Sequence, residues 1–369
     1  MRLVIVGAGV IGLLAAVEAV SAGHDVVLVD QAAIPNPGAA SCDRHRVIRA
    51  LHVDDPAATV AAVQAHHRWL ELADLLGTPC YHQVGALSVV PAAHLERAAA
   101  MLAQAGAPAR VLDPGTLAAR YPHVGFPAGA SAVLEPHAGV LLADRILATG
   151  TGWLRWHPAA QLRPHRTVAS VDADRATVRF ADGEVLAGDA VLLATGAWSR
   201  ALLPDTAGLV LYRQSMLYCA VPAADCAAWS ATPAVAATGS GGAWLVPPVA
   251  GTPLKLSAPA GCRAVPDIDD HSTPDLWRDR LVELFAATVP GFHAGWLVDT
   301  RDCYYLARST GGPLRTDLGV RVVAYPACGG SSFKFAPLIA RSLVDRLVRT
   351  GPRRSRPRPA PHPVMRGVS

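Results

Sequence analysis

The hydrophobic and polar positions at the start of the chain predict a strand, a helix and a second strand. Residues 3–6 form a continuous apolar run, which is typical of a parallel strand buried on both faces. A helical stretch follows at 10–22, and Gly23 suits the position just after a helix end. A second apolar run at 26–29 ends in Asp30.

Three glycines lie between the first strand and the helix, in the order G-x-G-x-x-G. Gly7 permits a tight turn, Gly9 lets the backbone approach a pyrophosphate, and Gly12 lets the helix pack closely on the strand. The helix N-terminus attracts phosphates, and Asp30 is placed to accept hydrogen bonds from a ribose. The alternative is a packing turn, and the motif does not distinguish NAD from FAD. The predicted dinucleotide site comprises Gly7, Gly9, Val10, Ile11, Gly12 and Asp30.

Later segments alternate between helical and strand-like patterns, separated by turns rich in proline and glycine. Helices are predicted at 56–76, 92–105, 114–120, from 143, at 274–288, and from the glycine-rich turn 328–334 to about 349. Strands are predicted at 84–90, 167–172, 176–180, 184–186, 190–194 and 320–324, with several more within 209–260. We expect the closing strand, turn and helix to pack beside the first unit.

Nucleotide-binding segments at both ends of the chain enclose a middle insert, which predicts discontinuous domains. We expect an α/β protein, α+β overall, with a Rossmann-like nucleotide-binding domain and an inserted antiparallel-sheet substrate domain. The predicted division assigns 1–80, 140–208 and 300–350 to the nucleotide-binding domain, 81–139 and 209–299 to the substrate domain, and 351–369 to a disordered basic tail.

The composition is that of a globular protein with reduced cysteines. Of 369 residues, 51% are hydrophobic and 17% are charged, which suffices for a large core. The apolar stretches are interrupted, and the chain starts almost directly in a core strand, so neither a transmembrane helix nor a signal peptide is predicted. Seven cysteines without regular spacing argue against a disulfide framework. We expect a cytoplasmic monomer.

The net charge of +4 arises at the end of the chain, where 351–369 contains five arginines and no acid. A basic tail can bind nucleic acid or a membrane. We expect instead a disordered proline- and arginine-rich end, with neither partner. His66 and His67 are adjacent and would point about 100° apart on a helix, so no metal site is predicted.

Several short motifs occur in the order found in a known family. After the glycine fingerprint they are Arg46-Val47-Ile48-Arg49, Leu134-Glu135-Pro136, Gly139-Val140, Gly196-Ala197-Trp198-Ser199, Tyr212-Arg213-Gln214, Leu254-Lys255-Leu256, Cys303 with Tyr305, and Gly330 with Phe333-Lys334-Phe335. From residue 1 to about 350 the chain resembles FAD-dependent amine oxidases of the D-amino-acid-oxidase superfamily. It is most similar to the branch of monomeric sarcosine oxidase and N-methyltryptophan oxidase, which includes oxidases of cyclic imino acids.

The resemblance implies FAD as the cofactor and gives roles to matching residues. Cys303 matches the cysteine that joins the flavin through an 8α thioether. Arg49 and Lys334 match the pair that holds the substrate carboxylate. Lys255 matches a lysine that promotes reduction of O2, because a cation stabilises the developing negative charge. The alternatives are a small buried cysteine, a surface arginine, a lysine in the first turn of a helix, and an edge-strand lysine.

Further contacts to the flavin follow from the same resemblance. Arg46 matches an arginine close to the flavin ring, and Val168 matches a backbone contact to adenine. Cys42 and Cys328 stand at flavin-facing positions that usually hold a histidine and an apolar aromatic residue. The remaining implied cofactor contacts are Gly196, Trp198, Gly329, Gly330 and Lys334.

Two departures from the family pattern concern the substrate. Pro259 stands where the pattern has an active-site histidine, and Trp244 stands where it has a tyrosine. Sarcosine itself is therefore not expected, and a flatter, larger substrate such as a cyclic or aromatic amino acid would suit Trp244. The predicted catalytic residues are Lys255, Arg49, Lys334, Arg46 and Trp244.

The expected activity is oxidation of a secondary amine or a cyclic imino or amino acid to an imine, with O2 converted to H2O2. The alternatives are an FAD-dependent dehydrogenase with another electron acceptor, a noncovalent enzyme like glycine oxidase or D-amino-acid oxidase, and an NAD-dependent enzyme. A non-catalytic nucleotide-binding protein is the alternative from another class.

Overall fold

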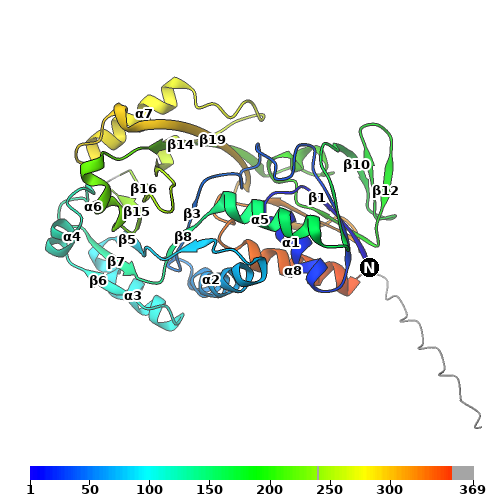
Figure 1. Ribbon diagram of the computed structural model, residues 1–369, viewed down its shortest axis with the longest axis horizontal. Coiled ribbons are helices and arrows are strands. Elements are labelled where there is room, and N and C mark those ends of the chain that lie inside the picture. The colour runs from blue at the N-terminus through cyan, green and yellow to red at the C-terminus, as the bar shows by residue number, and fades with distance from the viewer. Residues whose placement is uncertain (239–240, 351–369) are drawn as a thin grey trace, which may run out of the picture.

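The computed structural model describes residues 1–238 and 241–350, so the predicted tail at 351–369 lies outside the described residues. Within them the strands form four sheets. Figure 1 shows the six-stranded sheet with its helices on the right of an elongated molecule, and the nine-stranded sheet on the left.

The six-stranded sheet contains the predicted N-terminal unit. Its order is β20-β21-β13-β1-β2-β9, and all neighbours are parallel except β20 and β21. The strands are β1 (Arg2–Val6), β2 (Asp25–Val29), β9 (Ala160–Arg163), β13 (Ala190–Leu193), β20 (Leu314–Asp317) and β21 (Val322–Ala327).

Alternate residues of β1 enter two different cores, because successive side chains of a strand point to opposite faces. Leu3 and Ile5 pack with helices α1 (Val10–Ser21), α2 (Pro56–Leu76), α5 (Ala143–Trp156) and α8 (Ala336–Thr350). Val4 and Val6 pack with β10 (Val168–Asp172), β11 (Thr177–Phe180) and β12 (Val185–Ala187), which form an antiparallel three-stranded sheet. The continuous apolar run therefore forms a strand buried on both faces, as predicted.

The nine-stranded sheet is antiparallel except where β5 and β15 run parallel. Its order is β18-β14-β17-β16-β15-β5-β7-β6, and β19 also pairs with β14. The strands are β5 (Ala86–Val90), β6 (Arg110–Leu112), β7 (Ser131–Glu135), β14 (Leu209–Cys219), β15 (Ala234–Thr238), β16 (Ala243–Val246), β17 (Leu254–Ser257), β18 (Cys262–Ala264) and β19 (Leu297–Arg308).

Smaller elements connect and cover these sheets. A third antiparallel group contains β3 (Arg46–Ile48), β4 (Tyr81–His82) and β8 (Gly139–Leu141). The other helices are α3 (Leu95–Gln104), α4 (Pro114–Arg120), α6 (Cys226–Ser230) and α7 (Asp275–Thr288), with 3-10 turns η1 (Ala92–His94), η2 (Gly196–Ala201), η3 (Ala223–Asp225), η4 (Pro259–Gly261) and η5 (Ala294–Trp296).

The closing unit differs from its prediction in three ways. Strand β21 begins at Val322, because Val320 is 69% exposed and lies before the buried strand. Helix α8 packs against α1, but β13 lies between β21 and β1. Lys334 lies in the turn before α8, so the alternative of a lysine in the first helical turn is wrong.

The predicted domain boundary at residue 300 falls inside β19, whose pairing with β14 runs from Leu297 to Arg308. This strand leaves the nine-stranded sheet only a few residues before β20 of the six-stranded sheet. No turn signal marks the passage, because one continuous strand crosses the predicted boundary. The division into two domains remains a prediction.

Candidate functional site

A cavity of about 750 Å³ is lined by residues from both large sheets. The six-stranded side contributes the turn after β1, the start of α1, η2 and the turn 328–334. The nine-stranded side contributes β14, β15, β16, β17 and β19. The carboxyl ends of β1 and β13 open into it, which is where open α/β sheets bind ligands.

The glycine turn has no room for side chains at two positions. A Cβ on Gly12 would lie 1.9 Å from the Gly7 carbonyl oxygen, and one on Gly7 would lie 2.4 Å from the Ala194 oxygen. Gly7 also has φ +98°, which favours glycine. Gly12 does not line the cavity, and its contact with Gly7 agrees with the predicted packing role.

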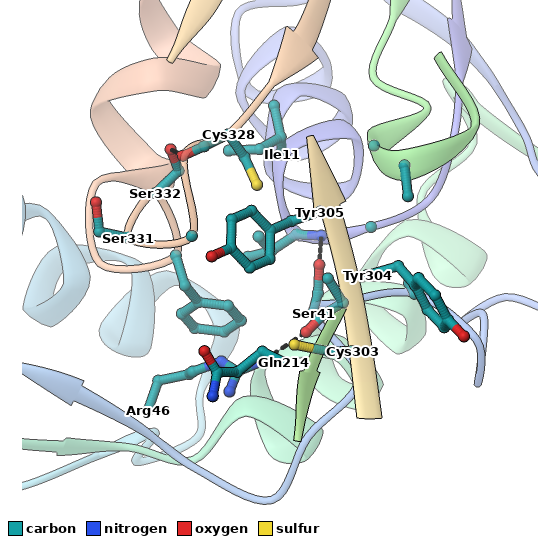
Figure 2. A pocket seen from close by; sticks show the side chains of 18 of the residues that line it. Ile11, Ser41, Arg46, Gln214, Cys303, Tyr304, Tyr305, Cys328, Ser331 and Ser332 are labelled. Atoms are coloured by element: carbon teal, nitrogen blue, oxygen red, sulfur yellow. Dashed lines mark hydrogen bonds between the residues drawn. The ribbon is translucent and has the colours of Figure 1, made fainter. Parts of the chain in front are cut away.

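The N-terminus of α1 faces the cavity through Gly9, Val10 and Ile11. The first turn of α1 holds no acidic residue, and Gly9 supplies no capping side chain, among the described residues. Ser41 Oγ accepts a hydrogen bond from Val10 N at 2.9 Å, as Figure 2 shows. The positive end of the helix dipole is therefore available to an anion.

Asp30 lines the cavity but is already engaged within the protein. Its carboxylate accepts hydrogen bonds from Ala8 N at 2.8 Å, Ala32 N at 2.9 Å and Asn36 Nδ2 at 2.8 Å. Burial raises its pKa above the usual value. A carboxylate has about four acceptor positions, so one remains for a ligand hydroxyl.

The other predicted cofactor contacts lie around the same cavity. Val168, Gly196 and Trp198 line it beside the glycine turn. Gly329 and Gly330 line it from the turn before α8, with φ +64° and +74°. Cys42 is not among the lining residues: it is half-buried and packs against the core cluster that includes α1, and its contact with the cofactor remains a prediction.

Arg49 and Lys334 lie next to one another in the cavity lining. Lys334 Nζ donates to the Arg49 carbonyl at 3.1 Å, and Trp69 Nε1 donates to the Lys334 carbonyl at 2.8 Å. Burial, and then the charge of Arg49, lower the pKa of Lys334 to about 7. Burial also lowers the pKa of Arg49, although Glu135 opposes this. A buried and a half-buried cation, both costly to desolvate, therefore face one region.

Lys255 lies in β17, which pairs on both sides with β14 and β16, so the edge-strand alternative is wrong. The side chain is 1% exposed. Its Nζ lies 5.6 Å from the ring centre of Trp244, which lines the cavity from β16. Burial, and then the like charge of Arg46, lower the pKa of Lys255 to about 8.

Cys303 lines the cavity from β19 and is 9% exposed. Figure 2 shows its sulfur near Arg46, with the turn that carries Cys328 and Ser332 at the opposite end of the view. Burial raises the pKa of the thiol, whereas Arg46 and Lys255 act to lower it. A thiolate formed at this position would be stabilised by two cations.

The sequence indicated neither Asp43 nor His45 as a site residue. Asp43 is buried and forms ion pairs with Arg46 and Lys255. His45 is fully buried in the cavity wall, and burial followed by the charge of Lys255 lowers its pKa to about 3, so its ring is neutral. Both lie in the arginine-rich loop, where Arg44 is exposed while Arg46 and Arg49 face the cavity.

One signal for this site was present in the composition. The chain has 33 lysines and arginines, of which Lys255 and Lys334 are the only lysines, and both line the cavity. Pro259, at the position of the family histidine, lies in η4 and is not among the lining residues. The sequence gives no local indication that Asp43 forms an ion pair with Lys255, because 212 residues separate the two.

Within 1–238 and 241–350, no group of three or more His, Cys, Asp or Glu residues is arranged to hold a metal ion. None of the helices described there is both long enough and apolar enough to cross a membrane.

The fold and the glycine-lined cavity define a dinucleotide-binding protein. Residues 2–346 match the family model of the FAD dependent oxidoreductases (DAO), so the chain belongs to this family. Membership resolves the choice between NAD and FAD that the glycine fingerprint leaves open.

Curated relatives include the N-methyl-L-tryptophan oxidases of Yersinia pestis (strain Pestoides F) and Yersinia pseudotuberculosis serotype O:3 (strain YPIII). Each is 25% identical to this chain over 212 residues, which cover 55% of the chain and 55% of the relative. The match thus spans about half the length of these relatives.

Two similar solved structures show the fold. NikD, described as an unusual amino acid oxidase essential for nikkomycin biosynthesis, is 20% identical with a TM-score of 0.77, covering 96% of this chain and 95% of that one. A modified fructosyl peptide oxidase from Aspergillus nidulans is 18% identical with a TM-score of 0.80, covering 95% of this chain and 91% of that one.

The cavity residues fit FAD. The glycine turn excludes a Cβ at Gly7 and Gly12, and a Cβ on Gly9 would lie 3.2 Å from Ser41 Oγ. These positions leave backbone amides and a helix N-terminus facing the cavity, which is the arrangement that binds a pyrophosphate.

Proposed function

We propose that this chain is an FAD-dependent oxidase of a secondary amine or a cyclic imino or amino acid that carries a carboxylate. The observation that carries the proposal is the convergence of Arg49, Lys334 and Lys255 on the cavity that begins at the glycine turn. The likeness to N-methyl-L-tryptophan oxidases supports it. When bound, FAD would accept a hydride from the carbon next to the substrate nitrogen, the nitrogen would lose a proton to give the imine, and O2 would take two electrons from the reduced flavin together with two protons to give H2O2.

In this proposal Arg49 and Lys334 bind the substrate carboxylate. Arg49 can donate two parallel hydrogen bonds, and Lys334 adds a compact positive charge. Because Lys334 is buried, Arg49 is half-buried and both carry lowered pKa values, a bound anion would compensate charges that the protein leaves poorly paired. Fixing the carboxylate fixes the direction of the rest of the substrate.

Trp244 would form the wall against which the substrate ring or side chain packs. It lines the cavity from β16, and its ring faces Lys255 at 5.6 Å. An indole surface suits a flat ring better than a small N-methyl group. We therefore propose a cyclic or aromatic amino acid rather than sarcosine.

Cys303 would hold the flavin covalently, and Arg46 would lie beside the flavin ring. The cysteine is buried in the cavity wall, and the electrostatic influence of Arg46 and Lys255 favours its thiolate. Lys255 would supply positive charge where O2 gains electrons. The proposed FAD site further includes Gly7, Gly9, Val10, Ile11, Gly12, Asp30, Val168, Gly196, Trp198, Gly329 and Gly330.

One observation favours an FAD-dependent dehydrogenase as a second candidate. Asp43 pairs with Lys255, and this reduces the net positive charge available to O2. An oxidase produces H2O2 in air, whereas a dehydrogenase turns over only with an added electron acceptor.

The direct test is a panel of N-methyl and cyclic amino acids with H2O2 detection in air. We expect H2O2 in amounts equal to the substrate consumed, and a loss of about 10²-fold or more in the rate of O2 reduction for Lys255→Met. Substrate oxidation that requires an added acceptor would establish the dehydrogenase instead. Unchanged O2 reactivity in Lys255→Met would remove the proposed role of this lysine.

A further inference from the structure

Asp43 lies at the centre of a buried charge cluster behind the cavity wall. Its side chain is 1% exposed, and its Oδ2 forms ion pairs with both Lys255 and Arg46. Tyr218 donates its hydroxyl proton to Asp43 Oδ1 at 2.5 Å, and Arg44 N donates at 2.6 Å. Burial opposes ionisation of Asp43, but Arg46 and Lys255 hold its pKa well below the usual range. The carboxylate is therefore charged.

Lys255 is enclosed by groups from several elements. From the loop before β3, the carbonyl of His45 accepts a hydrogen bond from Lys255 Nζ at 3.4 Å, and Asp43 supplies a carboxylate. The positive charge of Arg46 disfavours the charged form of Lys255 and lowers its pKa, as burial does. The remaining neighbours of Lys255 are Tyr218 on β14, Trp244 on β16 and Cys303 on β19, and the ring centre of Tyr218 lies 5.8 Å from Nζ.

The second lysine provides an internal comparison within the same cavity. Lys334 Nζ donates to a backbone carbonyl, that of Arg49. The carboxylate of Glu135 is close enough to raise the pKa of Lys334, but it accepts hydrogen bonds from Ala50 N at 2.6 Å and Leu51 N at 3.1 Å. Of the two lysines, Lys255 is thus the one with an ion-paired carboxylate.

We propose that Asp43 is a positioning residue that keeps Lys255 charged and fixes its ammonium group at the FAD cavity. Asp43 does not line the cavity, so it acts through Lys255 and Arg46. The ion pair holds Nζ in one place and offsets the cost of burying it. The importance of this arrangement for O2 reduction rests on the function proposed above, but its effect on Lys255 does not.

The presence of two lysines makes the test direct. Protein labelled with 13C at the lysine ε carbon gives two side-chain NMR signals, which Lys334→Arg assigns. In the FAD-bound protein, Asp43→Asn should lower the titration midpoint of Lys255 by about 1–3 pH units, because the carboxylate charge is lost. Tyr218→Phe keeps that carboxylate and should leave the midpoint near its original value. Asp43→Glu should restore most of the midpoint lost in Asp43→Asn.

The unsubstituted protein supplies a second measurement should Asp43→Asn fail to fold. Its Lys255 signal should titrate at a higher pH than its Lys334 signal. An unchanged Lys255 midpoint in Asp43→Asn, or the reverse order of the two lysines in the unsubstituted protein, would overturn the proposal. If the midpoint falls while the rate of O2 reduction keeps its pH profile, the proposal about Asp43 holds and the proposed role of Lys255 fails.

Discussion

Each buried cation of the cavity has a particular set of partners, and these partners decide what the residue can do. Lys255 and Arg46 are both ion-paired with Asp43, whereas Lys334 is hydrogen-bonded to the carbonyl of Arg49. Buried charges destabilise a fold unless they are paired or bind a ligand. Within the described residues Arg49 and Lys334 form no ion pair, so an anionic ligand such as an amino acid carboxylate would compensate their charge.

The charge of Lys334 should control the binding of carboxylates. Its pKa of about 7 means that the ammonium form dominates below this pH and the neutral amine above it. We expect the Kd of benzoate, a simple aromatic carboxylate, to rise as the pH increases through about 7, measured from the flavin spectrum. Lys334→Arg should remove most of this pH dependence, because arginine stays charged. A Kd that does not change with pH between about 6 and 9 in the original protein would contradict the assignment, because this range extends at least about one pH unit to each side of that pKa.

The proposed covalent bond makes Cys303 and Cys328 a matched pair. Both thiols line the cavity, and burial raises the pKa of both. Arg46 acts to lower the pKa of each thiol, whereas Lys255 acts on the pKa of Cys303. We expect acid precipitation to leave the yellow flavin with the protein in the original chain and in Cys328→Ala. Cys303→Ala should release it to the supernatant. Retention of flavin in the Cys303→Ala pellet would place the bond elsewhere.

At the scale of elements, the contact between α1 and the turn after β1 holds the dinucleotide-binding unit together. A Cβ at position 12 would overlap the Gly7 carbonyl at 1.9 Å, and backbone cannot move aside cheaply. The strand ends, the turn and the helix N-terminus are thereby kept in one geometry. The function of the glycine fingerprint is thus first a packing function.

Gly12→Ala should lower the free energy of unfolding by about 1–3 kcal/mol through overpacking, and should reduce bound FAD in the purified protein. Gly152→Ala is the matched control, since it lies within α5 and a Cβ there meets nothing within 4 Å. That substitution should raise the free energy of unfolding by about 0.5–1 kcal/mol and leave FAD unchanged. Urea unfolding and the flavin absorbance measure both effects, and equal stability of the two variants would be inconsistent with the packing argument.

Local patterns were sufficient to predict several elements, whereas the site required long-range contacts. The apolar run at 3–6 and the spacing of the glycines identify β1, the turn and α1, because each depends on neighbours in sequence. The passage of β19 across the predicted boundary depends on pairing with β14, which no local signal reports. For the same reason the sequence did not indicate that Asp43 would form an ion pair with Lys255.

At the scale of the whole molecule, the cavity lies where the two large sheets meet, and residues from both sheets line it. A ligand that fills this cavity would contact residues of both sheets. Binding of FAD should therefore stabilise the molecule as a unit rather than one sheet alone.

This coupling can be measured in Cys303→Ala, from which we expect FAD to be removable. The FAD-free protein should unfold at a lower temperature, and free FAD at about 100 times its Kd should restore about 2.7 kcal/mol of stability. Near-ultraviolet circular dichroism and tryptophan fluorescence should report one common transition with FAD bound. Separate transitions in the presence of saturating FAD would show that the cofactor does not join the two halves.

The most direct test of the proposed function is the visible spectrum of the purified protein under oxygen-free conditions. We expect a yellow protein whose flavin absorbance is bleached by a cyclic or N-methyl amino acid, and not by the corresponding amino acid amide, because Arg49 and Lys334 are proposed to bind a carboxylate. Admission of air should restore the colour. A flavin that no carboxylate-bearing amine bleaches, or that the amides bleach equally well, would contradict the proposal that this cavity oxidises an amino acid held by its carboxylate.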